Sequence, residues 1–188
     1  MSDDYTQVII LCEDKQQEVF LRRFLVKCGV NAHRIRVRPV PAGKGSGEQW
    51  VREQFAKEVK EHRSRAARLN IALLVMQDAD VASLEDRRQA LEHRLKAAGE
   101  GPRASEERIA MFFPRRNIES WIDFLNNGTQ IEETKLYANL AEQSDCYPGV
   151  DSIAIKNDYH LSANVPPSLR AACAEIRRIF PQKRCIDQ

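Results

Sequence analysis

The chain has 188 residues, of which 43% are hydrophobic and 30% are charged, with 29 Lys and Arg against 27 Asp and Glu. This length buries enough surface to fold without a disulfide or structural metal, and a net charge of +2 excludes a histone-like basic tail and an acidic disordered tail. No apolar run approaches the roughly 20 residues of a membrane span. The start reads as a strand and not as a signal peptide, and the five cysteines lack metal-ligand spacing. We therefore expect a cytoplasmic domain without a membrane segment.

The first quarter of the chain predicts a strand, a helix, a second strand and a loop. Residues 8–12 form a short β-rich apolar run, and residues 15–28 carry one apolar stripe of helical spacing that ends at Gly29. Residues 35–39 alternate apolar and basic side chains, so they predict a strand whose terminal proline favours a sheet edge. Residues 41–47, rich in glycine, form the main loop signal of the chain.

The middle of the chain continues the alternation. A helix is predicted around Val51, Phe55 and Val59, and its other face is basic. Residues 71–76 are uniformly apolar, as is typical of a central parallel strand covered on both faces. A helix at 84–98, a strand at 109–113 and a helix from 117 to 124 follow, with Asn117 expected to cap the last helix.

The last third of the chain is mixed. It predicts a short helix at 133–142, a short strand at 153–155 and an amphipathic helix at 169–180. The overall order of elements indicates an α/β fold, a Rossmann-like sheet of about four mostly parallel strands with flanking helices. We expect a core over 1–128 and a small helical C-terminal extension over 129–188 packed on it. Two separate lobes divided near residue 128 are the alternative.

Acidic residues follow two of the predicted strands. Glu13 ends the first strand, and Asp78 and Asp80 follow the third. Because ligands of open parallel sheets bind at the carboxyl ends of the strands, these three carboxylates are expected to converge. Mg²⁺ or Mn²⁺, which prefers oxygen ligands, would relieve their repulsion. The competing interpretation is that the aspartates form a turn or cap a helix, and that Glu13 begins one.

This strand–Glu13–helix unit, followed by an apolar strand ending in Asp78-Ala79-Asp80, resembles the TOPRIM domain of topoisomerases, primases and related nucleases. The stretch VIILCEDKQQEVFLRRFL is similar to the opening of the OLD (overcoming lysogenisation defect) nucleases. That branch usually has a glycine after the glutamate and a second acid four residues on, where this chain has Asp14 and Gln17. The ATPase domain usual in OLD proteins has no counterpart here, because no GxxxxGK[ST] motif occurs.

The resemblance implies two further site residues. OLD-type nucleases carry another acid after the fourth strand and a lysine late in the domain, and Glu119 and Lys156 are the matching candidates. The helix that carries Glu119 should begin at the same sheet edge as the three carboxylates. Glu119 would then complete the acidic cluster or orient a water, and Lys156 would offset charge on a phosphate.

Three basic residues are candidates for nucleic-acid contacts. Lys44 lies in the loop Gly43-Lys44-Gly45-Ser46-Gly47, whose amides suit a phosphate, although a plain surface loop and a nucleotide cradle are alternatives. Arg115 and Arg116 follow the fourth strand, where they would stand beside the metal site and grip phosphates.

Together these features predict an Mg²⁺- or Mn²⁺-dependent nuclease that cleaves DNA or RNA, with Glu13, Asp78 and Asp80 as metal ligands. The resemblance implies work in phage defence or DNA processing beside a separate ATPase partner. Two alternatives remain. One is a non-catalytic interaction or nucleic-acid-binding module, which Gln17 in place of an acid favours. The other is a phosphatase or phosphotransferase, against which Glu13 argues because such sheets usually carry a nucleophilic aspartate there.

Overall fold

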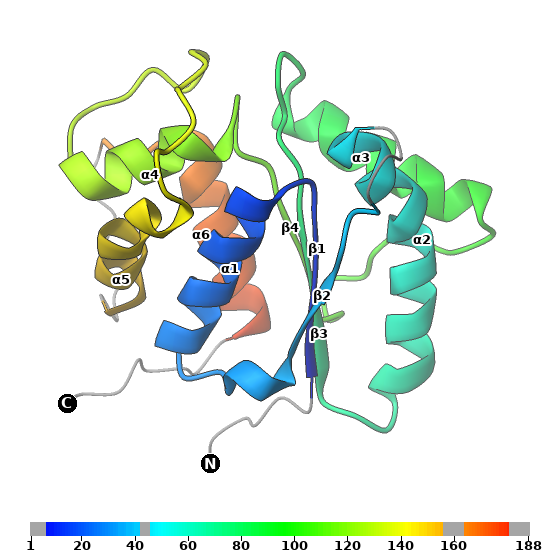
Figure 1. Cartoon of the computed structure of the whole chain (residues 1–188). Helices are drawn as coiled ribbons and strands as arrows, with labels where there is room; N and C mark the ends of the chain where they lie inside the picture. The colour runs from blue at the N-terminus through cyan, green and yellow to red at the C-terminus, as the bar shows by residue number, and fades with distance from the viewer. Residues whose placement is uncertain (1–6, 42–45, 156–163, 181–188) are drawn as a thin grey trace.

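The computed structural model describes residues 7–41, 46–155 and 164–180. Its strands form one four-stranded, all-parallel sheet in the order β2-β1-β3-β4, which Figure 1 shows edge-on between two layers of helices. The predicted α/β class and parallel sheet are confirmed. The strands are β1 (Gln7–Cys12), β2 (Ile35–Arg38), β3 (Ile71–Met76) and β4 (Ile109–Phe112).

Helices cover both faces of the sheet. On one face lie α1 (Lys15–Lys27), α4 (Ile118–Asn127), α5 (Tyr147–Ile155) and α6 (Pro167–Ile179). On the other lie α2 (Gly47–Ala66) and α3 (Leu84–Ala97). Two short 3₁₀ segments, η1 (Ala32–Arg34) and η2 (Gln143–Cys146), precede β2 and α5. Among the residues that the structure describes, no helix is both long and apolar enough to cross a membrane.

The central strand β3 is apolar throughout because both of its faces are covered. Leu74 and Met76 join the apolar cluster under α1, whereas Leu73 and Val75 join the cluster under α2 and α3. The prediction of a buried central strand at residues 71–76 is therefore confirmed.

The pairing of β1 with β3 positions the candidate site. Cys12, the last residue of β1, lies opposite Met76, the last residue of β3. Because both strands run in the same direction and end together, the residues that follow them emerge side by side at one edge of the sheet. Those residues are Glu13 and the segment from Gln77 to Asp80.

Charged side chains close the outer edge of β4. The Arg103 guanidinium donates to the Ile109 carbonyl at 2.8 Å, and the Met111 amide donates to a Glu175 carboxylate oxygen at 3.2 Å. Arg178 of α6 also donates to the Ile109 carbonyl. Two outward backbone groups of this edge strand, the Ile109 carbonyl and the Met111 amide, are thus satisfied by side chains, which disfavours pairing with another strand.

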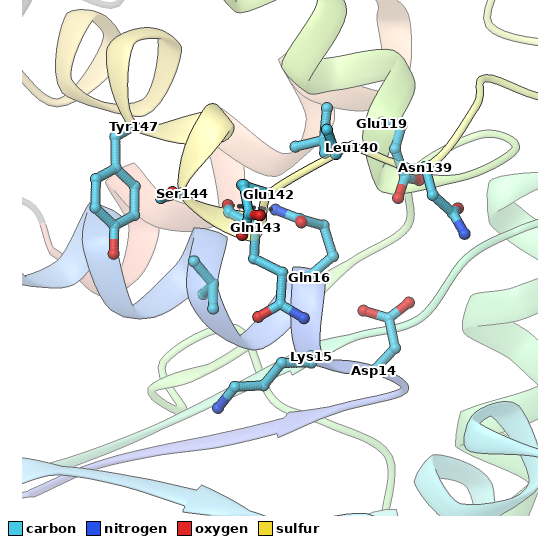
Figure 2. Close-up of a pocket in the computed structure, with 12 residues that line it drawn as sticks. Asp14, Lys15, Gln16, Glu119, Asn139, Leu140, Glu142, Gln143, Ser144 and Tyr147 are labelled. Atoms are coloured by element: carbon cyan, nitrogen blue, oxygen red, sulfur yellow. Dashed lines mark hydrogen bonds between the residues drawn. The ribbon is translucent and has the colours of Figure 1, made fainter.

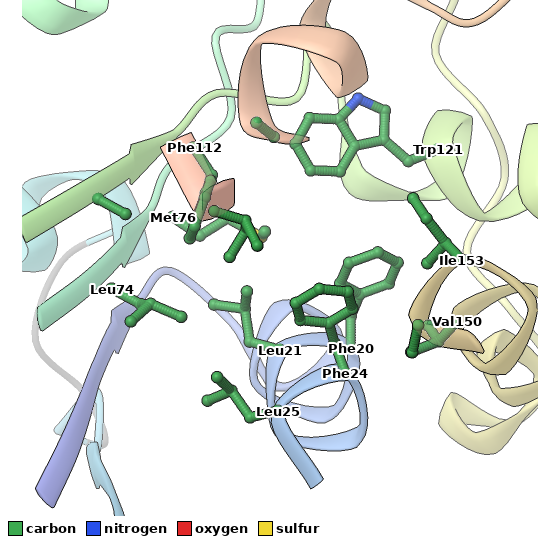
Figure 3. Close-up of a cluster of buried hydrophobic side chains, with 14 of the residues drawn as sticks. Phe20, Leu21, Phe24, Leu25, Leu74, Met76, Phe112, Trp121, Val150 and Ile153 are labelled. Atoms are coloured by element: carbon green, nitrogen blue, oxygen red, sulfur yellow. The ribbon is translucent and has the colours of Figure 1, made fainter. Parts of the chain in front are cut away.

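A cluster of aromatic and aliphatic side chains holds the residues after 128 against the sheet. Figure 3 shows Phe20 and Phe24 of α1 between Trp121 of α4 and two residues of α5, Val150 and Ile153. The Phe20 and Trp121 rings are 6.2 Å apart, and the indole N–H of Trp121 donates to the Ser168 hydroxyl at 2.7 Å. The C-terminal helices therefore share the apolar core of the sheet.

The helix predicted at residues 133–142 is wrong, because this segment is irregular in the structure. Its polar groups bind elsewhere in the chain: the Glu133 carboxylate accepts from the Ser168 amide at 3.1 Å, and the backbone of Tyr137 pairs with the Asn117 side chain. Leu136 is 70% exposed, so the segment has no buried apolar face to stabilise a helix.

The strand predicted at residues 153–155 is also wrong, because these residues end helix α5. The Tyr-Pro-Gly sequence at the start of α5 is typical of a turn, but proline is also favoured in the first turn of a helix. Gly149 is needed for close packing, since a Cβ atom there would lie 2.6 Å from the Leu125 Cβ atom. Its amide donates to the Asn126 side chain at 2.8 Å.

We expect Gly47→Ala to destabilise the fold. Gly47 begins α2 against the chain just after β1, and an added Cβ atom would lie 2.1 Å from the Glu13 carbonyl oxygen. The backbone must move to relieve this clash, so the free energy of unfolding should fall by about 1–3 kcal/mol in urea denaturation. Gly101→Ala is the control, because a Cβ atom there meets nothing within 4 Å. Equal stability of the two variants would contradict the close approach at Gly47.

Candidate active site at the carboxyl edge of the sheet

Glu13 and Asp78 meet at the carboxyl ends of β1 and β3. The Asp78 amide donates to Oε2 of Glu13 at 3.2 Å. The other carboxylate oxygen of Glu13, Oε1, is buried and has no hydrogen-bond partner among the described residues. A buried polar atom left without a partner is unfavourable, so Glu13 retains the capacity to bind a further donor or a cation.

Gln17 joins the two acidic positions from the first turn of α1. Its side chain is fully buried, its Nε2 donates to Oδ1 of Asp78 at 2.9 Å, and its Oε1 accepts from the Glu13 amide at 3.0 Å. The Asp14 carboxylate caps α1 by accepting from the Gln17 amide at 2.8 Å. The helix start thus fixes an amide group where the family that the sequence resembles usually has a second acid.

Asp80 turns away from this pair. Its backbone is in the left-handed region with φ +54°, which aspartate tolerates better than most residues, and its carboxylate accepts from Nη2 of Arg87 at 3.1 Å. Asp80 remains 48% exposed. Among the described residues, no three Asp, Glu, His or Cys side chains are arranged to share one metal ion. The structure therefore brings Glu13 and Asp78 together and pairs Asp80 with an arginine.

Glu119 lies at the start of α4, as predicted, and is only 8% exposed. Together with Asp14 it lines an open hollow of about 650 Å³ between α1 and residues 139–147. Figure 2 shows the Asp14 and Glu119 carboxylates turned toward each other across this hollow. Asp14 and Glu119 therefore line an acidic hollow next to the sheet edge that carries Glu13 and Asp78.

The prediction that the Asn117 side chain caps α4 is wrong, although the residue stands at the predicted position. Asn117 occupies the position before α4, but its side chain makes no capping hydrogen bond to the helix. Its Nδ2 donates to the Tyr137 carbonyl at 2.8 Å, and its Oδ1 accepts from the Tyr137 amide at 3.3 Å. Asn117 thus holds the irregular segment beside the hollow.

Burial dominates the electrostatics of the acidic pair. Burial, and after it the nearby Glu13 and Asp14 carboxyls, together raise the pKa of Asp78 to about 9. Burial also raises the pKa of Glu13 to about 7, although the hydrogen bond from the Asp78 amide acts in the opposite direction. The pKa of Glu119 is raised by burial as well. Without a cation, the interior of this site favours protonated carboxyls.

The basic residues that the sequence predicts to contact a phosphate differ in their surroundings. Arg115 donates to the Ala82 carbonyl and so braces the loop after β3. Arg116 is half-buried and makes no hydrogen bond or ion pair within the described part of the chain. Lys44 and Lys156 both lie outside the described residues. Arg116 is therefore the basic candidate whose charge remains available at this edge.

Two contributors were not predicted as site residues. Glu48 in the first turn of α2 and Arg87 in α3 are bonded to each other and lie beside Asp80. They are 39 residues apart, and no spacing rule connects them. The one available signal was Gly47, directly before Glu48, which lies against the Glu13 carbonyl.

Comparison of the chain with protein-family models, with curated proteins and with solved structures finds no match.

We expect the stability of the metal-free protein to fall as the pH rises from the ordinary carboxyl pKa of about 4 up to about 9, since the pKa values of Glu13 and Asp78 are about 7 and about 9, and the fall is to be measured between pH 7 and 9. Both pKa values are raised by folding, so the folded state binds more protons than the unfolded state and loses this advantage as the pH rises. Thermal melts in a chelator should show this slope, and Asp78→Asn should flatten it.

Asp123→Asn, a change on the outer part of α4, is the control and should keep the wild-type slope. The pH window lies above the ordinary pKa of histidine, so buried His62, whose pKa is lowered by burial, contributes nothing to it. An unchanged slope in Asp78→Asn would show that Asp78 is already ionised in the folded protein.

Proposed function

We propose that this protein is a metal-dependent nuclease that hydrolyses a phosphodiester bond in DNA or RNA. The observation that carries the proposal is the buried Glu13–Asp78 pair at the carboxyl ends of two central strands, with one Glu13 oxygen unpartnered among the described residues. This is the edge where ligands bind in open parallel sheets. The TOPRIM resemblance of the sequence supports the same function.

The residues present suit Mg²⁺ or Mn²⁺. Burial makes the charged forms of Glu13 and Asp78 unfavourable, and a divalent cation would stabilise those forms. Mg²⁺ typically takes one or two carboxylates and keeps waters and substrate phosphates in its other positions. Glu13 and Asp78 would hold the ion. When bound, such an ion polarises a phosphate and lowers the pKa of an attacking water.

Other residues of the chain would position the attacking water and the substrate phosphate. Glu119, with a pKa raised by burial, is placed to accept a proton from a water in the neighbouring hollow. Arg116 would bind a substrate phosphate, and Lys44 would do so from the glycine-rich loop. Lys156, assigned through the resemblance, would offset negative charge on the phosphate. The same resemblance supports a role in phage defence or DNA processing with a separate ATPase.

One observation favours a second candidate, a nucleic-acid-binding module without catalysis. Gln17 already donates to Asp78 at 2.9 Å, so one oxygen of this carboxylate is satisfied without a metal. A fully buried amide in this place stabilises the fold in the absence of a cation. Binding of nucleic acid without cleavage in Mn²⁺ would favour this candidate over the nuclease.

We expect Glu13→Gln and Asp78→Asn each to reduce the Mn²⁺-dependent cleavage rate by at least about 100-fold, which corresponds to about 2.7 kcal/mol in the barrier. Each change keeps the shape of the side chain and removes the charge that would hold the ion. The measurement is cleavage of labelled single- and double-stranded DNA and RNA, with folding confirmed by a thermal melt.

Glu85→Gln is the matched control, because Glu85 lies on the surface of α3 and pairs with Arg88. Its rate should stay within about threefold of wild type, which is under about 0.7 kcal/mol. Folded Glu13 and Asp78 variants that cleave at the wild-type rate would exclude this pair from the reaction.

We expect Arg116→Ala to weaken nucleic-acid binding and to reduce the slope of log K against log salt by about 0.9 on duplex DNA, because one phosphate contact is lost. Arg65→Ala is the control, since Arg65 lies at the C-terminal end of α2, far along the helix from the end that meets Glu13, and pairs with Glu61. Filter binding or fluorescence anisotropy over a salt series gives both slopes. Equal slopes for the two variants would assign Arg116 to the solvated surface.

A further inference from the structure

A guanidinium group occupies the outer part of the acidic edge. Arg87 is 13% exposed, its Nη1 donates to a Glu48 carboxylate oxygen, and its Nη2 donates to Asp80 at 3.1 Å. Its Nε donates to the Ala79 carbonyl at 3.2 Å. One side chain of α3 therefore joins the start of α2 to the loop after β3.

The carboxylates that Arg87 joins belong to the same acidic group as Glu13. Gly47, the residue before Glu48, is packed against the Glu13 carbonyl, so the start of α2 lies directly beside the end of β1. Asp80 and Glu48 are both close enough to raise the pKa of Glu13. The edge thus holds two acidic pairs, Glu13 with Asp78 and Glu48 with Asp80.

We propose that Arg87 takes the place of a second divalent cation, so that the site holds a single metal ion at Glu13 and Asp78. This inference rests on the proposed function. The guanidinium lies between the Glu48 and Asp80 carboxylates, which is where a cation would have to lie to bind both. Arginine stays charged at every physiological pH and presents donors in a fixed fork, so it neutralises this pair permanently.

Neighbouring arginines show that this arrangement is specific to Arg87. Arg88, the next residue along α3, pairs with Glu85 and Glu92 of its own helix. Arg52 approaches Glu48 from the same helix at 3.5 Å but, among the described residues, does not pair with Asp80. Of the basic side chains in the described ranges, Arg87 is the one bonded to acids of both α2 and the loop after β3.

The test is the number of Mn²⁺ ions bound by the full chain, measured by electron paramagnetic resonance of free Mn²⁺ during titration. Wild type should bind one ion. Arg87→Met removes the charge and leaves Glu48 and Asp80 unneutralised, so this variant should bind two. Adding Asp80→Asn to Arg87→Met should return the number to one. Arg88→Met, the matched control on the same helix, should bind one ion.

Two ions in wild type, or one ion in both wild type and a folded Arg87→Met variant, would overturn the inference. If Arg87→Met does not fold, Asp80→Asn in the wild-type background decides, and asparagine suits the left-handed backbone there. Retention of one ion supports the inference, and loss of Mn²⁺ binding makes Asp80 a ligand and overturns it. No ion in wild type but one in Arg87→Met would reject the proposed metal at Glu13 and Asp78 while upholding the role of Arg87. No ion in either protein would overturn both.

Discussion

The hydrogen bond from the Asp78 amide to the Glu13 carboxylate depends on the parallel register that sets Cys12 opposite Met76. A shift of β1 against β3 by one residue would turn the side chains of the shifted strand to the other face of the sheet. Gln17 would then lose its contacts to both positions, and Gly47 would no longer meet the Glu13 carbonyl. The site is therefore a consequence of strand pairing in the core, and the helices around it add precision.

The two acidic pairs at this sheet edge differ in the groups that stabilise their carboxylates. Glu13 and Asp78 are buried and accept donors from a backbone amide and from Gln17, neither of which carries a charge. Their charged forms are consequently unfavourable. Glu48 and Asp80 lie nearer to solvent and are neutralised by Arg87. The proposed metal ion would therefore act on the inner pair, where the described residues leave one carboxylate oxygen without a partner.

The fold was largely predictable, because β1, β3 and β4 are short apolar runs, β2 alternates apolar and basic residues, and the helices α1 to α4 carry recognisable apolar stripes or caps. Local pattern failed where distant side chains decide the backbone, as at Tyr137, which pairs with Asn117, and in α5, where Gly149 packs on α4. For the site, strand ends predicted the meeting of Glu13 with Asp78. The orientation of Asp80 was not predictable, since it depends on a left-handed backbone and on Arg87, a partner in the next helix.

The side chains that close the edge of β4 come late in the chain. Glu175, which accepts from the Met111 amide, lies 64 residues after it. A ribosome that adds about 5–20 residues per second needs roughly 3–13 seconds for that interval. During this time β4 can already pair with β3, yet its outer backbone groups have no protein partner from α6. The newly made sheet therefore passes through a period in which the edge that Glu175 and Arg178 later occupy is open to pairing with another strand.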